Sequence, residues 1–169
     1  MQLYREEENN MKKRVLTAVL AAALVTGTCA ATVSAKEEKT YTIGICQLVQ
    51  HDALDAATKG FEDAITEKMG DSVKFDEQNA QGDSNTCSTI INSFVSEGAD
   101  LILANATASL QAAAAGTSDI PILGTAVTEY GVALGIDDFD GTVGGNISGT
   151  SDLAPLDEQA DMLHELFPD

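Results

Sequence analysis

The sequence predicts an α/β protein in which a parallel β-sheet carries helices on both faces. Three observations lead to this fold class. Short runs of β-forming residues alternate along the chain with segments of helical periodicity, which is typical of parallel sheets. Residues 41–48 are continuously apolar at their centre, as expected of a strand buried on both faces. The 169 residues are 44% hydrophobic, which is enough to form the core of one ordinary domain.

The strands and the first helix follow from these patterns. The first helix, over residues 53–69, has its apolar side chains on one face, with Asp52 as a cap at its start and Gly70 at its end. Strands that alternate with helices pair in parallel through right-handed connections. The strands are expected at 41–48, 73–79, 101–104, 120–123 and 132–136.

Three further helices complete the predicted pattern. The second begins at Asp83 or Ser84 and ends at Gly98. An alanine-rich third helix covers residues 107–115, and the last covers 155–167. The last helix is amphipathic, and its apolar face carries Leu156, Ala160, Leu163 and Phe167.

Polar loops follow the ends of the predicted strands. In open parallel sheets, ligands bind in the crevice beyond the carboxyl ends of the strands. The second and third helices begin at this edge, and their free amide groups favour a carboxylate or another anion. An alternative stays open, in which the polar residues only cap helices. The loops are rich in Asn, Gln, Ser, Thr and His and cover residues 47–52, 79–84, 105–109 and 125–130.

The charge of the chain excludes several partners. With 27 acidic and 9 basic residues, the formal net charge is −18, and no Lys or Arg follows Lys74. Binding to nucleic acid or to an anionic lipid surface needs clustered basic residues, so neither partner is expected. A solvated acidic surface explains the charge, and a cation-binding role is the alternative.

The first 35 residues resemble a targeting segment. A short basic region, Met11 to Arg14, precedes the apolar stretch 15–25, and small residues end at Ala35 in a pattern that fits a secretory cleavage site. We therefore expect an exported protein that starts at Lys36, with residues 1–35 as an upstream extension and signal peptide. Cleavage before a lipidated Cys29 is an alternative that would anchor the protein to a membrane. Met11, rather than Met1, is hypothesised to be the true start.

No pattern in the sequence predicts an enzyme. The turn after the first strand lacks G-x-G-x-x-G, and neither a P-loop nor a G-x-S-x-G nucleophile motif occurs. The acidic run 137–140 does not fit a calcium loop, because Ile136 and Ile147 would occupy ligand positions. The three cysteines lack zinc-site spacing. Accordingly, no catalytic residue, cofactor or metal is expected.

Two cysteines remain in the predicted mature chain. Cys46 lies in the first strand and Cys87 lies early in the second helix. Export would permit a disulfide between them, whereas burial as free thiols is the alternative.

Several blocks of sequence resemble one known family, the tryptophan/tyrosine-type substrate-binding proteins of bacterial ABC importers. The resemblance extends over residues 41–169, and its combination of blocks is more specific than any block alone. The blocks are Tyr-Thr-Ile-Gly-Ile-Cys-Gln-Leu-Val-Gln-His-Asp at 41–52, Asn-Ala-Gln-Gly-Asp at 79–83, Ala-Asn-Ala-Thr at 104–107, Ile-Pro-Ile-Leu-Gly at 120–124 and Ile-Ser-Gly-Thr-Ser-Asp at 147–152.

This resemblance implies a fold and a set of ligand contacts. Proteins of this family have two Rossmann-like lobes of the type I periplasmic-binding class, which close on a ligand between them. The resemblance implies that residues 36–150 form the first lobe and that 151–169 are a crossover and the first helix of a second lobe, so the chain is interpreted as an N-terminal fragment. The implied contacts are Gln47, His51, Asn105, Ala106, Thr107, Ala126, Val127 and Thr128, with Ser151 and Asp152 near the crossover.

The function implied is extracytoplasmic capture of a small solute for an ABC permease and ATPase. The resemblance points to an amino acid, with an aromatic one favoured in the family, but Tyr130 is the one aromatic residue in the polar loops. Two alternatives remain: an exported sensor lobe for a small ligand, and an exported metal-dependent α/β hydrolase. A one-lobe module that works alone is the alternative to a fragment.

Overall fold

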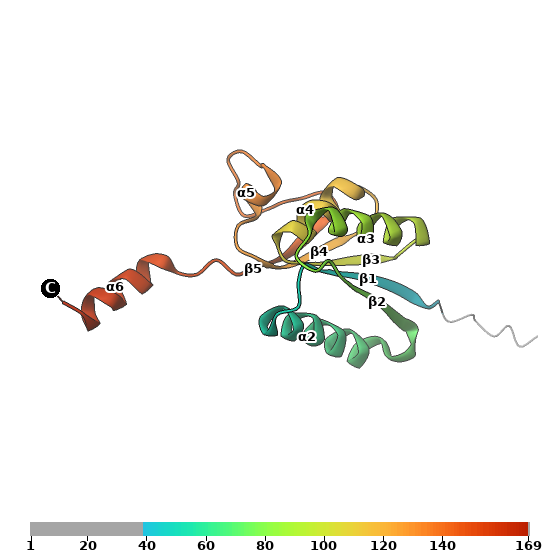
Figure 1. Ribbon diagram of the computed structural model, residues 1–169, viewed down its shortest axis with the longest axis horizontal. Helices are drawn as coiled ribbons and strands as arrows, with labels where there is room; N and C mark the ends of the chain where they lie inside the picture. Colours follow the sequence, from blue (N-terminus) through green and yellow to red (C-terminus); the bar gives the residue numbers. More distant parts are fainter. Residues whose placement is uncertain (1–38, 169) are drawn as a thin grey trace, which may run out of the picture. The chain divides into compact units, whose positions relative to one another are not determined.

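The computed structural model describes residues 39–168, which form a five-stranded sheet with helices on both faces (Figure 1). All strands are parallel, in the order β2-β1-β3-β4-β5, which confirms the predicted fold class. The predicted signal segment and Cys29 lie outside the described residues. The strands are β1 (Tyr41–Gln47), β2 (Val73–Asn79), β3 (Leu101–Asn105), β4 (Ile122–Val127) and β5 (Ile147–Ser151).

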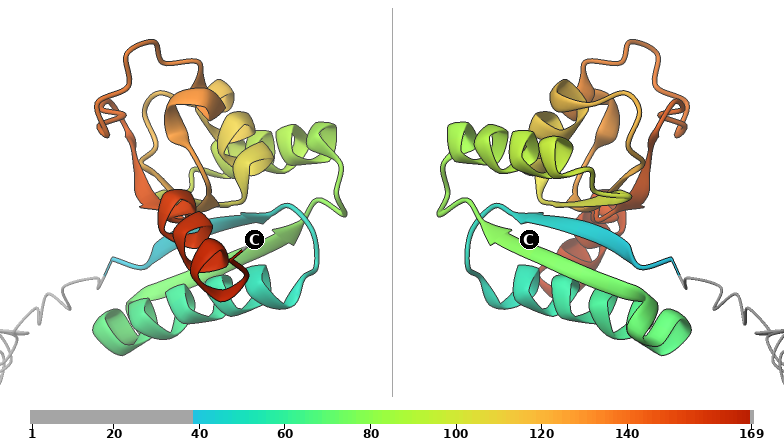
Figure 2. Two further views of the ribbon diagram at one scale, coloured as in Figure 1. Left: turned by 90° about the vertical axis from the view of Figure 1, so that its left-hand side faces the viewer. Right: turned by 90° about the vertical axis from the view of Figure 1, so that its right-hand side faces the viewer.

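The helices divide between the two faces of the sheet. Helix α2 (Asp52–Met69) covers one face and is followed by the short 3-10 turn η1 (Gly70–Ser72). Helices α3 (Ser84–Glu97) and α4 (Thr107–Gly116) cover the other face, as the two side views show (Figure 2). The short α5 (Tyr130–Leu134) and the terminal α6 (Leu156–Leu166) complete the described chain.

The core has two parts, one on each face. The larger part packs α3 and α4 against the sheet through fully buried Ile91, Phe94, Ile102 and Leu110. The smaller part lies under α2 and is centred on Ile43, Ile45 and Leu103. Burying each such side chain stabilises the fold by about 1.5–3 kcal/mol, so the sheet is held mainly from the α3–α4 side.

The helix ends fit the sequence prediction with one change. Helix α3 is capped by the Asp83 carboxylate, which accepts from the Thr86 amide at 2.8 Å, and it ends at Gly98 in the left-handed conformation. Helix α2 was expected to be capped by Asp52, but His51 is its cap: His51 Nδ1 accepts from the Ala53 amide at 3.2 Å. The imidazole ring therefore replaces the expected carboxylate.

The prediction of a fifth strand at 132–136 was wrong. Residues 130–134 are the helix α5, because the Glu129 carboxylate accepts from the amides of Gly131 and Val132 at its start. Val132 is 83% exposed, whereas its neighbour Ala133 is buried in the larger core. The fifth strand is instead β5, whose Ile-Ser-Gly-Thr-Ser sequence is too polar to give a strand signal and depends on pairing with β4.

Helix α6 has an exposed apolar face. It was predicted at 155–167 and is found at Leu156–Leu166. None of its residues is buried, and in Figure 1 it stands away from the sheet. Among residues 39–168, no helix has both the length and the apolar character that a membrane crossing requires. The apolar face of α6 and the residue after it present large side chains that are each more than half exposed: Leu156, Met162, Leu163, Leu166 and Phe167.

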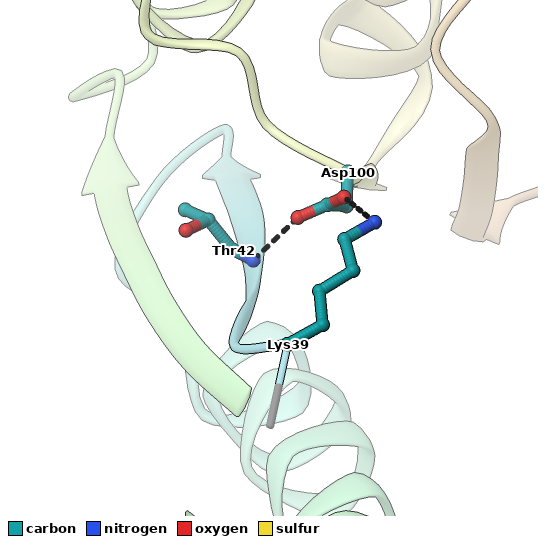
Figure 3. A network of polar contacts seen from close by, with 3 residues as sticks. All are labelled: Lys39, Thr42 and Asp100. Atoms are coloured by element: carbon teal, nitrogen blue, oxygen red, sulfur yellow. Dashed lines mark hydrogen bonds and ion pairs between the residues drawn. The ribbon is translucent and has the colours of Figure 1, made fainter. Parts of the chain in front are cut away.

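A polar contact ties the amino end of β1 to the chain before β3. Asp100 accepts from the Thr42 amide at 2.9 Å and from Lys39 Nζ at 2.9 Å (Figure 3). The Thr42 amide, and then the Lys39 ammonium, hold the pKa of the Asp100 carboxyl below its usual value. Lys39 Nζ also lies 4.4 Å from the centroid of the Tyr41 ring.

This contact makes folding stability dependent on pH. Because the pKa of Asp100 is lower in the folded state than in the unfolded chain, its contribution is complete above about pH 4 and is lost as the pH falls through the folded pKa. Asp100→Asn should therefore lower stability at pH 7 and reduce the loss of stability on acidification. Urea unfolding at a series of pH values measures this. An acid profile identical to that of the wild type would contradict it, and Asp71→Asn at an exposed position is the control.

Strand β1 has no room for a side chain at Gly44. A Cβ atom there would lie 2.6 Å from the ring of Phe94, which is buried in the larger core. Gly44→Ala should cost about 1–3 kcal/mol of unfolding free energy, because the aromatic ring must move. Gly60 on α2 has open space around it, so Gly60→Ala should stabilise the helix by about 0.5–1 kcal/mol. Equal effects of the two substitutions in urea unfolding would refute this packing argument.

Candidate functional site

The carboxyl ends of the strands are level, so the polar loops gather at one edge of the sheet. Gln47 at the end of β1 is paired in register with Asn79 of β2 and with Asn105 of β3. Asn105 is paired in turn with Thr125 of β4. The structure therefore brings together three of the strand ends from which the predicted ligand contacts project.

A buried hydrogen-bond network lies beneath these loops. Thr58 of α2 donates from Oγ1 to Gln47 Oε1 at 2.7 Å and accepts from Asn105 Nδ2 at 2.9 Å. Asn105 Nδ2 also donates to the Leu54 carbonyl at 2.9 Å. Gln47 Nε2 donates to Asp55 Oδ1 at 2.6 Å. Two strands and one helix are thus joined at the edge where the loops begin.

Two of the predicted contact residues are buried beneath the loops and support them from below. Gln47 is 2% exposed, Asn105 is 0% exposed, and both lie below the loop surface. His51, by contrast, is exposed at the start of α2. Asn105 Oδ1 is a buried acceptor without a hydrogen-bond partner among residues 39–168. The network therefore keeps one unused acceptor at the centre of the edge.

Helix α4 begins without a capping side chain. Ala106 precedes it with φ of 96°, a conformation that L-residues rarely adopt. Its amide donates to the Thr125 carbonyl at 3.0 Å, which holds this strained residue in place. Thr107, in the first turn, is half-buried. The amides of this turn have no side-chain partner, so they can receive an anionic group.

The loop after β4 is joined to the end of β5. Ala126 also has a positive φ, at 53°. The next residue, Val127, is buried, and its carbonyl accepts from the Asp152 amide at 3.1 Å. The exposed Thr128 accepts at its carbonyl from Ser151 Oγ at 2.8 Å. The predicted first-lobe contacts Val127 and Thr128 are therefore neighbours of Ser151 and Asp152, which were predicted near the crossover.

The charge at this edge is acidic. The described chain has four lysines, which lie at the opposite end of the sheet or along α2: Lys39, Lys59, Lys68 and Lys74. Carboxylates lie in or next to the loops at the carboxyl edge: Asp52, Asp55, Asp83, Glu129 and Asp152. A cationic group on a ligand would be attracted to this edge, and an anionic group must be received by backbone amides.

Two pockets lie beside the last strands. The larger, of about 510 Å³, lies between Thr128–Tyr130, the chain around Phe139 and Val143, and β5 with Ser151. The smaller, of about 310 Å³, lies on the α2 face between Phe61, Leu123 and Gly149. The larger pocket reaches the predicted contacts Thr128 and Ser151, so it adjoins the candidate site.

The two cysteines are free and buried on the α3–α4 side. Cys46 Sγ lies 3.6 Å and Cys87 Sγ 3.7 Å from Ser109 Oγ, which is itself fully buried. Burial raises the pKa of the Cys46 thiol to about 12, so it stays protonated at neutral pH. Cys46 and Cys87 are therefore free thiols, as in the second of the two alternatives, and form no disulfide with each other. Within residues 39–168, no group of three metal-ligating side chains is close enough to hold a metal.

Sequence reasoning missed Thr58 and Asp55. A signal for Thr58 was present, because it lies one turn after Leu54 and so shares the apolar face of α2 with Phe61. A polar residue on an otherwise apolar helix face indicates a buried hydrogen bond. Asp55 gave no such signal, since acidic residues are common in the first turn of a helix.

Removal of the Thr58 hydroxyl tests the network. Thr58→Val keeps the shape of the side chain but leaves Gln47 Oε1 and Asn105 Nδ2 each without one partner in a buried place. We expect the unfolding free energy to fall by about 1–3 kcal/mol. Thr66→Val, at an exposed position of the same helix, is the control and should change it by less than about 0.5 kcal/mol. Equal unfolding curves for the two variants would contradict the assigned role.

A comparison with protein families matches residues 42–169 to the model described as ABC transporter substrate binding protein. Among curated proteins, the chain is 46% identical over 134 residues to a tyrosine-binding protein of Clostridioides difficile strain R20291. The match covers 78% of this chain and 39% of that protein. The chain therefore spans less than half the length of this relative. The matched proteins are binding proteins, as the sequence analysis predicted, and not enzymes.

Solved structures show the same similarity. One is the ligand-free, open form of a substrate-binding protein with adhesive properties from Clostridium difficile, with 43% identity, a TM-score of 0.68, and 76% of this chain and 44% of that chain covered. Another is an ABC domain from Streptococcus pneumonia in complex with L-Trp, with 33% identity, a TM-score of 0.68, and 75% and 43% covered. A conserved domain protein from Vibrio cholerae has 33% identity, a TM-score of 0.70, and 78% and 45% covered.

Proposed function

The chain belongs to the family of ABC transporter substrate-binding proteins, and we propose that it contributes to the capture of an amino acid outside the cytoplasm for an ABC importer. The observation that carries this proposal is the uncapped first turn of α4, which opens onto an otherwise acidic edge. An α-amino acid has the matching pair of charges. Its carboxylate would bind the α4 amides, and its ammonium group would face the carboxylates of the neighbouring loops.

Four short segments form the ligand contacts in this proposal. Thr107 would add a hydroxyl donor next to the helix amides, and Ala126 and Ala106 would present backbone held in positive-φ conformations. Thr128, His51 and Ser151 are exposed at the same edge. Gln47 and Asn105 would act from below, with Asn105 Oδ1 as the unused acceptor. Two of the similar proteins, a tyrosine-binding protein and an ABC domain in complex with L-Trp, support an aromatic amino acid.

The proposal includes a second lobe. Residues 36–150 would form one lobe, and 151–169 would form the crossover and the first helix of the other. This arrangement accounts for the exposed apolar face of α6, which would be covered within a second lobe. The ligand would be enclosed between the lobes, so the contacts of one lobe alone would give weak binding.

Export and partners complete the proposal. The basic and apolar segment before Ala35 would act as the export signal, and a lipid on Cys29 would be the alternative anchor. An ABC permease and its ATPase would receive the solute. The acidic surface is compatible with an exported protein and makes a nucleic-acid partner unfavourable.

Binding by the chain itself can be measured with ¹H–¹⁵N NMR titration, which detects millimolar affinity. L-Tyrosine or L-tryptophan should shift the amide signals of Thr107, Ala108 and Ser109. Thr107→Val should weaken binding about ten- to hundredfold, because it removes a hydrogen bond to a charged group. Thr89→Val, at an exposed position of α3, is the control.

Two ligand analogues test the charge argument in the same titration. N-Acetyl-L-tyrosine lacks the ammonium group and tyramine lacks the carboxylate, so each should bind more weakly than L-tyrosine. Unchanged amide signals at millimolar L-tyrosine and L-tryptophan would contradict the proposed function. Equal binding of L-tyrosine and both analogues would instead refute the assignment of the two charged groups.

A further inference from the structure

Tyr130 fills a space that two glycines leave open. Gly124 of β4 and Gly149 of β5 are paired in register. A Cβ atom on Gly124 would collide with the Tyr130 hydroxyl, and a Cβ atom on Gly149 would collide with both that hydroxyl and the Gly124 backbone, so both positions require glycine. The Tyr130 side chain is nearly buried, and its hydroxyl donates to the Thr150 carbonyl at 3.2 Å. The Tyr130 side chain therefore packs against both β4 and β5, and it is buried there and not exposed among the loops; we call this contact the brace.

The brace lies at an irregularity in the pairing of β4 with β5. Gly124 pairs with Gly149, and the next registered pair is Val127 with Ser151. Two residues of β4, Thr125 and Ala126, therefore face the single residue Thr150 of β5, which is a β-bulge. Ala126 takes its positive φ within this bulge. The carbonyl that Tyr130 binds belongs to Thr150, the residue opposite the bulge.

The bulge sets the direction of the loop that follows it. Beyond it, the Val127 and Thr128 carbonyls accept from the Asp152 amide and from Ser151 Oγ. Bulges turn a strand and re-aim its side chains, and they are common beside functional sites. Within residues 39–168, the Tyr130 hydroxyl is the one side-chain donor to the Thr150 carbonyl. Without this bond, no side chain would hold the carbonyl of the β5 residue that lies opposite the bulge.

We propose that Tyr130 is a positioning residue of the ligand site, whose hydroxyl holds the β4–β5 bulge so that Ala126 and Thr128, which flank the buried Val127, face the ligand. This inference rests on the proposed function, because it assumes that the ligand binds at this segment. Burial raises the pKa of the Tyr130 phenol, and the nearby Asp152 carboxylate raises it further. The hydroxyl therefore remains a donor through neutral pH.

Tyr130→Phe tests the proposal, because it removes the hydroxyl and keeps the ring. In NMR spectra of the chain without ligand, the amides of Ala126 to Thr128 and of Thr150 to Asp152 should shift. Binding of L-tyrosine should weaken about fivefold to tenfold, as expected for one lost hydrogen bond that positions the site. Tyr41→Phe is the matched control, since Tyr41 lies at the amino end of β1 beside Lys39. It should leave these amides and the binding unchanged.

A second control separates positioning from a general loss of stability. Ile91→Val removes one methylene group from the core on the α3–α4 side, far from the bulge in sequence, and should destabilise the fold without changing the affinity. The proposal is overturned if the amide signals of the bulge residues in Tyr130→Phe keep their wild-type chemical shifts. It is also overturned if the affinity falls no more than in Ile91→Val. If the wild type binds neither amino acid, the proposed function fails, and the shifts of the bulge amides alone then decide whether Tyr130 holds the bulge.

Discussion

The hydrogen bonds that join Gln47, Thr58 and Asn105 are the interaction on which the site depends. They lie at the carboxyl ends of the two central strands and fix α2 against them in a fully buried place. Buried polar groups are costly unless they are satisfied, so the network allows few alternative placements of the helix. Since the loops begin at these residues, the geometry of the binding edge follows from the network beneath it.

Two further constraints act on the loops above the network. The starts of α2, α3 and α5 are capped by His51, Asp83 and Glu129, whereas the start of α4 has no such side chain. Ala106, just before this start, and Ala126, at the end of the neighbouring strand β4, hold positive φ angles. Strain of this kind persists only where the surrounding structure enforces it, and it is common at binding sites. One amide cluster is therefore left for a ligand at an edge that is otherwise acidic.

The sequence predicted most of the fold because its strongest signals are local. Apolar runs marked β1, β3 and β4, and the periodicity of α2 and the glycine after α3 marked those helices and their ends. β5 was missed because Ile-Ser-Gly-Thr-Ser is held by pairing with β4 and by Tyr130, which are contacts distant in sequence. The apolar residues 132–134 gave a strand signal, but the Glu129 cap and Gly135 make them helical. Register brings the predicted contact residues together, but no pattern revealed that Gln47 and Asn105 are buried.

The central claim is that an amino acid binds at the carboxyl edge of this sheet. Hydrogen exchange measured by mass spectrometry, with and without saturating L-tyrosine, tests it most directly. The account predicts slower exchange in peptides that cover residues 47–52, 105–109 and 125–130, and no change in peptides that cover 97–101 and 117–121 at the opposite edge. Protection confined to the opposite edge, or equal exchange in both states at every peptide, would contradict it.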